Sequence, residues 1–229
     1  MMKICASITE VQPGEFDKTV ARAFDMGATF LEIRFDYISK NKFSEALATV
    51  RPYKAKCIYT LRRTGQGGKF DGPDKQRVRY LKELACQLPM MIDVEYETLQ
   101  ECPELCSFIK SLKIPILLSW HDFRSTPSEK EMLELLALMS TYSNNNKLVT
   151  MAKSLEDTLR AMSLYETVDK SVSLVAFCMG EIGLLSRVLC SSRSNCPFTY
   201  ASLDRPIAPG QVTVEQMKKL QSMISSMHN

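Results

Sequence analysis

Short apolar segments alternate with longer amphipathic segments along the whole chain. Most apolar segments lack a period-two alternation, which is typical of strands buried on both faces of a parallel sheet. These predicted strands lie at residues 2–8, 29–35, 56–61, 90–95, 115–120, 147–151, 173–178 and 198–202. The amphipathic segments predict helices at 14–26, 43–52, 74–87, 98–111, 128–140, 154–168, 182–191 and 213–226.

Local signals support several of these helices. The segment Asp25-Met26-Gly27 indicates a helix end with a glycine stop, and Pro127-Ser128-Glu129 indicates a helix start. Ser154 is followed three residues later by Asp157, which is typical of an N-cap. Eight β/α units predict a (β/α)8 barrel, with a doubly wound open sheet as the alternative. No long linker, low-complexity segment or repeat divides the chain, so we expect one domain over residues 1–229.

Composition narrows the class of protein. The chain has 229 residues, 45% hydrophobic and 24% charged, with a formal net charge of only +3. Its basic residues are scattered, which argues against a nucleic-acid surface but leaves anionic small substrates open. No apolar run is long enough to predict a membrane span, and the first ten residues hold too short a run for a signal peptide. We therefore expect a cytoplasmic protein.

Cysteine and histidine usage bears on redox state and metals. The eight cysteines are dispersed rather than set in a short secreted framework, so we expect reduced thiols. The chain has only two histidines, His121 and His228, which makes a histidine-rich metal site improbable and predicts no metal. If imidazole chemistry occurs here, His121 must supply it; the other interpretation is a hydrogen-bonded structural histidine.

Ionisable residues gather where four consecutive predicted strands end. In a β/α barrel these ends form the active-site face, and buried charges are costly unless they are paired. A site is therefore favoured over chance structural pairs. The segments are Glu32-Ile33-Arg34-Phe35-Asp36, Arg62-Arg63, Asp93-Val94-Glu95 and His121-Asp122.

Three later features have both a functional and an ordinary interpretation. Lys147 follows a polar loop, where a solvated lysine is the more usual outcome; pointing into the barrel, it would be a nucleophile. Arg187 would either bind a carboxylate or lie in solvent. The glycine loop at 65–68 matches neither the dinucleotide nor the P-loop pattern, so we expect it to provide tight turns.

Taken in order, these segments resemble the type I 3-dehydroquinate dehydratase family. The resemblance runs through all eight units, and the joint order of the motifs is far more specific than any one of them. The motifs are Glu32-x-Arg34-x-Asp36, Arg62 with Gly67-Gly68, Ser119-x-His121-Asp122-Phe123 followed by Thr126-Pro127, Lys147 followed by aliphatic residues and Met151, Ser186-Arg187, and Ala208-Pro209-Gly210-Gln211.

The chain departs from the family pattern at three places. Gln66 stands where some members carry a glutamate, which puts acid–base help from that position in doubt. Ile207 stands where a small hydroxyl residue is frequent, so one hydrogen bond to substrate is expected to be missing. The sequence starts at its first strand, so the N-terminal hairpin of longer relatives is expected to be absent.

The resemblance implies dehydration of 3-dehydroquinate to 3-dehydroshikimate in the shikimate pathway, without metal or organic cofactor. It makes Lys147 the amine that forms a Schiff base and His121 the general acid and base. Arg187, Arg62 and Gln211 would hold the substrate carboxylate and nearby hydroxyls, and Glu32 and Arg34 the ring hydroxyls. A homodimer is compatible with it. Asp122 neighbours His121 in the strand and should point to the opposite face, so it should not orient the ring.

Two alternatives remain at this stage. Another lysine-dependent aldolase or lyase on the same barrel would need a phosphate-binding loop near the last strands, and residues 208–211 do not look like one. A catalytically silent barrel that serves as a binding module would have no need to retain both Lys147 and His121. Turnover of 3-dehydroquinate distinguishes the three.

Overall fold

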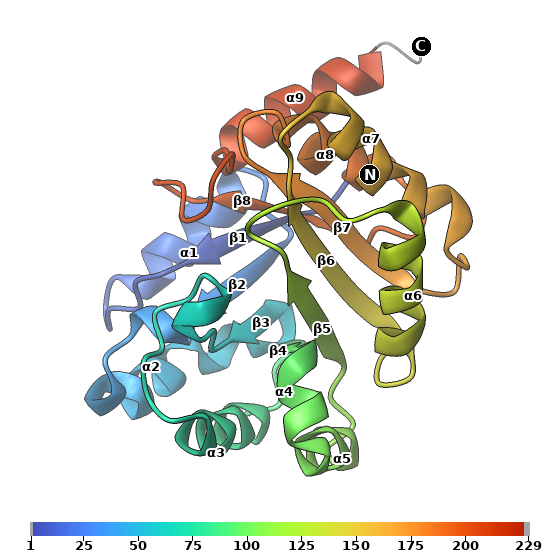
Figure 1. The fold of residues 1–229 in the computed structure, drawn as a ribbon. Helices are drawn as coiled ribbons and strands as arrows, with labels where there is room; N and C mark the ends of the chain where they lie inside the picture. The colour runs from blue at the N-terminus through green and yellow to red at the C-terminus, as the bar shows by residue number, and fades with distance from the viewer. Residues whose placement is uncertain (1, 227–229) are drawn as a thin grey trace.

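A computed structural model describes residues 2–226 of the chain, and its centre is one eight-stranded parallel sheet (Figure 1). The strands follow one another in chain order from β1 to β7, and β8 pairs with the other edge of β1. The strands are β1 (Ile4–Ile8), β2 (Phe30–Arg34), β3 (Cys57–Thr60), β4 (Met91–Glu95), β5 (Ile116–His121), β6 (Asn145–Met151), β7 (Ser173–Met179) and β8 (Thr199–Ser202).

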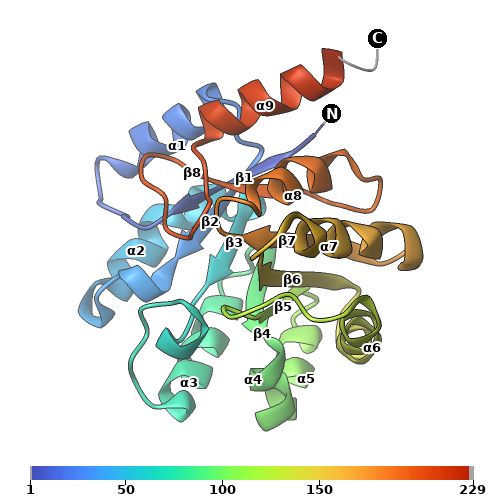
Figure 2. The ribbon, with the colours of Figure 1, turned by 45° about the horizontal axis from the view of Figure 1, so that its top comes forward.

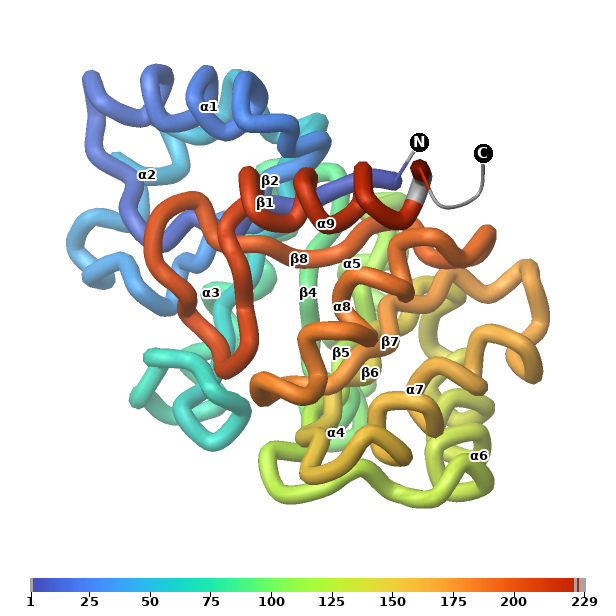
Figure 3. Tube along the Cα trace, turned by 90° about the horizontal axis from the view of Figure 1, so that it is seen from above, coloured from blue at the N-terminus to red at the C-terminus, as the bar shows by residue number. Residues whose placement is uncertain are grey.

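The helices surround the strands on the outside, which gives a nearly closed barrel (Figure 2). Seen from above, α9 runs alongside β1 and so joins the end of the chain to its start (Figure 3). The helices are α1 (Phe16–Asp25), α2 (Phe43–Val50), α3 (Asp74–Ala85), α4 (Tyr96–Glu101), α5 (Pro103–Ser111), α6 (Glu129–Ser140), α7 (Leu155–Thr167), α8 (Leu184–Leu189) and α9 (Val214–Ser226). Short 3₁₀ helices lie at Phe35–Tyr37, Lys40–Lys42, Arg51–Lys56, Thr64–Gln66 and Cys190–Ser192.

The predicted (β/α)8 architecture is confirmed. The strands follow the chain order around the barrel with the helices outside, and the reversal of strand order that marks a doubly wound open sheet is missing from residues 2–226. The predicted helix starts are also confirmed. Ser128 and Ser154 each cap a helix through a reciprocal capping box, with Glu131 and Asp157 as their partners. Gly27 follows α1 at φ +108°, a backbone conformation that glycine adopts without steric cost.

Two predicted boundaries were wrong. The single helix expected at 98–111 is divided into α4 and α5 at Cys102, which has φ −139° and ψ 71°. Pro103 is the cause, because its ring disfavours a helical conformation for the preceding residue. The sixth strand begins at Asn145 rather than at 147, so that Lys147 lies within β6.

The alternation within β2 shows how the barrel separates core from site. Leu31 and Ile33 are fully buried in the hydrophobic core. Glu32 and Arg34, between and after them, line a cavity at the barrel mouth. Successive strand residues point to opposite faces, so two charges can follow apolar neighbours directly without entering the core.

All eight cysteines, which lie between Cys5 and Cys196, are free thiols, as predicted. Within residues 2–226 no helix is both long and apolar enough to span a membrane. His228 lies outside the described residues.

Candidate active site

The cavity lies at the carboxyl ends of the strands and has a volume of about 520 Å³ with its open mouth included. All seven candidate residues from the sequence line it, although they come from six different segments of the chain. They are Glu32, Arg34, Arg62, His121, Lys147, Arg187 and Gln211. Residues that the sequence did not single out complete the lining, together with five residues of the motifs or their departures. The former are Ser7, Val149, Phe177, Met179 and Tyr200, and the latter are Gln66, Gly67, Phe123, Ile207 and Ala208.

Lys147 is buried, with only 6% of its surface exposed, so the expectation of a solvated lysine was wrong. It is the third residue of β6 and faces the barrel interior, where its Nζ donates a hydrogen bond of 3.1 Å to Oδ2 of Asp93. Oε1 of Glu32 lies 3.8 Å from the same nitrogen. The ring centroid of Tyr200 lies 4.3 Å from it. Two carboxylates therefore compensate the charge of a lysine that is removed from water.

Asp93 on β4 is the residue that connects the site, and no role was assigned to it from the sequence. Its Oδ1 accepts hydrogen bonds from Arg62 Nη2 at 2.5 Å and from Ser119 Oγ at 2.7 Å. Burial alone would raise the pKa of Asp93, but the charges of Arg62 and Lys147 and the bond from Ser119 hold that pKa well below its usual range. Its sequence signal was the charged segment Asp93-Val94-Glu95 in an apolar strand.

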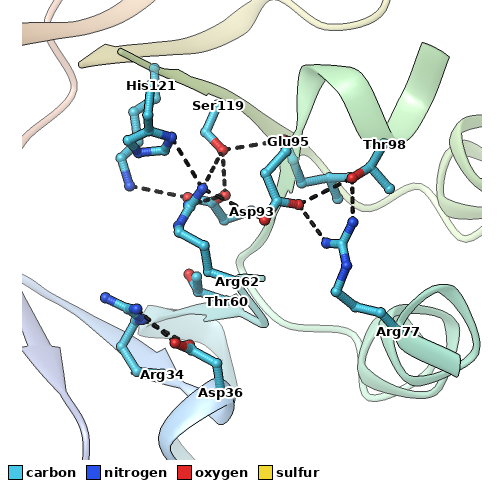
Figure 4. A network of polar contacts seen from close by, with 12 residues as sticks. Arg34, Asp36, Thr60, Arg62, Arg77, Asp93, Glu95, Thr98, Ser119 and His121 are labelled. Atoms are coloured by element: carbon cyan, nitrogen blue, oxygen red, sulfur yellow. Dashed lines mark hydrogen bonds and ion pairs between the residues drawn. The ribbon is translucent and has the colours of Figure 1, made fainter. Parts of the chain in front are cut away.

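Figure 4 shows Arg62 between Asp93, Ser119 and His121, with a second buried network beside it, at the right of the view. In that network Arg77 of α3 donates to Glu95 Oε2 at 2.6 Å and to Thr98 Oγ1 at 2.5 Å. The other oxygen of Glu95 lies 3.8 Å from Arg62 Nη1. Arg77 thus links α3 to β4, the strand that also carries Asp93, and so stabilises the position of that strand.

His121 ends β5, and its ring stacks on Phe123 with the centroids 5.9 Å apart. Its Nδ1 lies 3.3 Å from Nη1 of Arg62. A guanidinium can only donate, so this contact favours the tautomer with the proton on Nε2. Burial and the charges of Arg62 and Lys147 lower the pKa of His121 well below 6.5. The imidazole of His121 is therefore neutral at neutral pH.

Asp122 does not contact the His121 ring in this arrangement. Its carboxylate accepts hydrogen bonds from the backbone nitrogens of Arg124 and Ser125, at 2.7 and 3.0 Å, and from the Ser125 hydroxyl. It shapes the loop that follows β5. The prediction that Asp122 does not orient the imidazole is confirmed.

Arg187 differs from the other two arginines that line the cavity. Arg34 makes a two-pronged pair with Asp36, and Arg62 is paired with Asp93. Arg187, on α8, is only 2% exposed; it donates to the carbonyl of Pro209 at 3.1 Å, and its guanidinium lies 4.3 Å from the centroid of the Phe177 ring. Within residues 2–226 it forms no salt bridge with a carboxylate, and its Nε has no hydrogen-bond partner.

This lack of a counter-charge has a physical consequence. Burial lowers the pKa of Arg187 to about 10, because no carboxylate offsets the loss of hydration. A buried cation with an unused donor is a site for an anion, and the planar guanidinium fits a carboxylate. The solvent interpretation of Arg187 was wrong.

The remaining candidates have defined partners. Glu32 accepts hydrogen bonds from the hydroxyls of Ser7 at 2.8 Å and Thr60 at 3.0 Å. Gln211 accepts from the backbone nitrogen of Ile207 at 2.9 Å, which holds the loop after β8 against the cavity. Gln66 has a buried Oε1 without a hydrogen-bond partner in the described residues. Gln66 lines the cavity, and this oxygen has unused bonding capacity.

The glycine loop provides tight turns, as predicted. Gly67 has φ +73°, and a Cβ at Gly68 would lie 2.0 Å from the carbonyl oxygen of Arg62. Any side chain at Gly68 would displace the backbone that carries Arg62. Among residues 2–226 no group of three or more His, Cys, Asp or Glu side chains is placed to hold a metal ion.

Comparisons with known proteins identify the family and the fold. The family model described as type I 3-dehydroquinase matches residues 4–228. The 3-dehydroquinate dehydratase of Dehalococcoides mccartyi (strain CBDB1) is 36% identical over 220 residues, covering 93% of this chain and 92% of the relative. That of Thermococcus onnurineus (strain NA1) is 34% identical over 203 residues, with coverages of 88% and 90%. The crystal structure of the 3-dehydroquinate dehydratase from Aquifex aeolicus VF5 superposes with a TM-score of 0.78 at 26% identity, covering 97% and 98% of the two chains.

Proposed function

The chain belongs to the type I 3-dehydroquinase family, and we propose on that premise that it converts 3-dehydroquinate to 3-dehydroshikimate through an imine on Lys147. The observation that carries the assignment of the amine is its place in the cavity. Lys147 is a buried lysine whose nitrogen lies among Asp93, Glu32 and the ring of Tyr200, on the same cavity wall as His121. Schiff-base chemistry is characteristic of this family, and no other lysine lines the described cavity.

The first half of the reaction forms the imine. The neutral amine of Lys147 adds to the substrate ketone, and the former carbonyl oxygen leaves as water after it has gained two protons. His121, whose imidazole is neutral, transfers protons in this step. The product is a protonated C=N bond, which withdraws electrons from the adjacent C–H bond.

The second half removes water from the ring. His121 takes the C2 proton, and the bonding pair moves toward the imine nitrogen to give an enamine. The pair then returns and expels the neighbouring hydroxyl, which takes the proton from His121 and leaves as water. Hydrolysis of the imine releases the product and restores the amine. General acid–base catalysis of this kind typically contributes about 10²–10⁴-fold.

Arg187 is the residue best suited to hold the substrate carboxylate. It is the buried guanidinium without a carboxylate partner in the described structure, whereas Arg62 is already paired with Asp93. Arg62 adds a second positive charge to the same cavity. Gln211, which also lines it, is proposed to bind the hydroxyls next to the carboxylate. Glu32 and Arg34 line the cavity and are proposed to bind the ring hydroxyls. No metal or organic cofactor takes part in this scheme.

The setting of the enzyme is also a proposal. A lyase for a small hydroxylated keto acid has a place in the shikimate pathway of aromatic amino-acid biosynthesis. We expect residues 1–229 to act as a single catalytic domain in the cytoplasm. A homodimer is compatible with this function. Gel filtration with light scattering would measure the oligomeric state.

Turnover of 3-dehydroquinate tests the proposed activity. The purified protein should produce 3-dehydroshikimate, identified by its conjugated enone absorbance and by mass. Lys147→Ala should abolish turnover, whereas Lys153→Ala, which changes an exposed lysine in the same strand–helix loop, should keep it. Absence of turnover by the wild-type protein would favour a silent barrel, and turnover of a phosphorylated sugar would favour an aldolase.

A further inference from the structure

Among residues 2–226, three side chains make direct contacts with the nitrogen of Lys147, and two of them are acids. Asp93 on β4 and Glu32 on β2 place carboxylate oxygens at 3.1 and 3.8 Å. The third neighbour is the ring of Tyr200 on β8, with its centroid at 4.3 Å. An aromatic face attracts a cation through its quadrupole, but it has no basic atom that could remove a proton.

The ring of Tyr200 is fixed by its surroundings. Phe198 packs against it edge-on with the centroids 5.5 Å apart, and Phe177 does so at 6.4 Å. Only 3% of Tyr200 is exposed, and its backbone pairs with Cys5 of β1. The face of the ring therefore cannot turn away from Lys147 without displacing two other aromatic side chains.

The hydroxyl of Tyr200 contributes little to this arrangement. It is buried and has no hydrogen-bond partner within residues 2–226. Burial, together with the negative charge of Glu32, raises the pKa of Tyr200 well above 10, so the ring remains a neutral phenol. A buried hydroxyl without a partner lowers the free energy of unfolding. The hydroxyl therefore does not explain a tyrosine at this position, and the ring is the part that contacts Lys147.

An aromatic ring beside the imine nitrogen can assist the reaction by stabilising its positive charge. A protonated imine is an electron sink, whereas a neutral imine is a poor one. The carboxylates of Asp93 and Glu32 stabilise the cation, but as bases they can also accept its proton. A ring that stabilises the cation without competing for the proton protects the reactive form.

We infer that Tyr200 is a further catalytic residue, whose ring face keeps the imine nitrogen of Lys147 protonated while the C2 proton is removed. This inference rests on the proposed function, because it presupposes an imine on Lys147. It concerns the ring and not the hydroxyl, so phenylalanine should replace Tyr200 fully and an aliphatic residue should not.

The variants Tyr200→Phe and Tyr200→Leu separate the two parts of the side chain. Tyr200→Phe should keep kcat within about two-fold of wild type and unfold at an equal or higher urea concentration. Tyr200→Leu should lower kcat by about two- to thirty-fold, the range that cation–π interactions support, with a smaller change in KM. If Tyr200→Leu does not fold, Tyr200→Met, with its adaptable unbranched side chain, makes the same test.

Tyr59 offers a matched control. It is another fully buried tyrosine of the barrel whose hydroxyl has no hydrogen-bond partner in the described part of the chain, but it packs on Phe35 and does not line the cavity. Tyr59→Phe and Tyr59→Leu should leave kcat near the wild-type value, even where stability falls. If kcat falls as much in Tyr59→Leu as in Tyr200→Leu, the loss comes from looser packing of the barrel. That result would contradict a catalytic role for Tyr200.

A pH profile adds a readout that looser packing would not move. Loss of the ring should shift the alkaline limb of kcat to lower pH in Tyr200→Leu, and Tyr200→Phe should not shift it. The other ionisable groups around the nitrogen are unchanged in both variants: Cys5 on β1, Glu32 on β2, Arg62 in the loop after β3, Asp93 on β4 and His121 on β5.

The outcomes distinguish this inference from the function on which it rests. Equal losses of kcat in Tyr200→Phe and Tyr200→Leu would assign the effect to the hydroxyl and overturn the inference. Wild-type kcat in Tyr200→Leu would overturn it as well. Failure of the proposed function would appear instead in the wild-type protein, as absence of a borohydride-reduced adduct on Lys147.

Discussion

Nζ of Lys147 on β6 and Oδ2 of Asp93 on β4 are joined by a hydrogen bond of 3.1 Å across the barrel interior. The same carboxylate binds the guanidinium of Arg62 through its other oxygen. One buried anion therefore compensates both the proposed nucleophile and the arginine that contacts His121. Any change at Asp93 should affect Lys147 and, through Arg62, His121 together.

Asp93→Asn should be among the most damaging conservative substitutions in the site. It leaves Lys147 and Arg62 buried without this counter-charge, and removal of one partner from a buried ion pair costs about 3–5 kcal/mol in the free energy of unfolding. Urea denaturation should show that loss, and kcat/KM should fall by about 100-fold or more. The pKa of Asp93 is lowered by folding, so its contribution to stability is present above about pH 4 and is lost as the pH falls below that.

Asp122→Asn is the matched control for Asp93→Asn. Asp122 also lies beside the site, but its carboxylate contacts only the loop after β5, and an amide oxygen can accept the same backbone bonds. The kcat/KM of the Asp122→Asn variant should stay within a few-fold of the wild-type value. Comparable losses in the two variants would contradict the central place given to Asp93.

Arg187→Met should weaken substrate binding without weakening the fold. The free protein carries an uncompensated buried charge at this position, so an apolar side chain of similar length should keep or raise the free energy of unfolding. Arg187→Lys keeps the charge but loses the planar fork, and loss of a charge-assisted bond of about 1.5–3 kcal/mol should lower kcat/KM by about 10- to 150-fold.

Arg62→Lys provides the contrast for Arg187, because Arg62 is already paired with Asp93. It should lower both stability and kcat/KM. Wild-type kcat/KM in both lysine variants would show that neither arginine binds the carboxylate.

The pH dependence of kcat/KM should report the low pKa of His121. Burial and the charges of Arg62 and Lys147 lower that pKa, so the imidazole stays neutral below the value of about 6.5 for a free histidine. The acid limb of kcat/KM should therefore fall below pH 6.5. The same shift reduces stability as the pH falls from about 6.5, because the unfolded chain binds the proton first. An acid limb centred above pH 6.5 would be incompatible with this environment.

His121→Ala and Lys147→Ala should both be nearly inactive and yet differ by intact mass. His121→Ala keeps the amine, so slow imine formation should leave a covalent population after long incubation with substrate or product. Lys147→Ala removes the amine and should show none. Near wild-type turnover in His121→Ala would require another base, and Glu32, which lies 3.8 Å from Lys147, would be the first candidate.

The fold followed from the sequence because short apolar segments alternate with amphipathic helical segments along the whole chain. The seven candidate residues proved to line one cavity. Local chemistry explains the boundary error at Pro103, since the break affects only one turn within an otherwise amphipathic segment. The motif order brought together residues as distant as Glu32 and Gln211, which no local pattern could have done.

The sequence could not show which way a side chain points or which residues it contacts. Whether Lys147 faced solvent or the barrel depended on a strand boundary two residues away, at Asn145. Asp93 carried a visible charge, but its bonds to Arg62 and Lys147 depend on the register of three strands. Nothing in the sequence marked Tyr200, because its contact with Lys147 forms only when β8 pairs with β1.

Borohydride trapping followed by peptide mapping tests the central claim most directly. The protein is incubated with 3-dehydroquinate, reduced with borohydride and digested, and the modified peptide is identified by mass spectrometry. The reduced adduct is predicted on the peptide that contains Lys147, and Lys147→Ala should give no adduct. An adduct on Lys153 or any other lysine, or turnover by wild type without any trapped adduct, would contradict the assignment of Lys147 as the imine-forming residue.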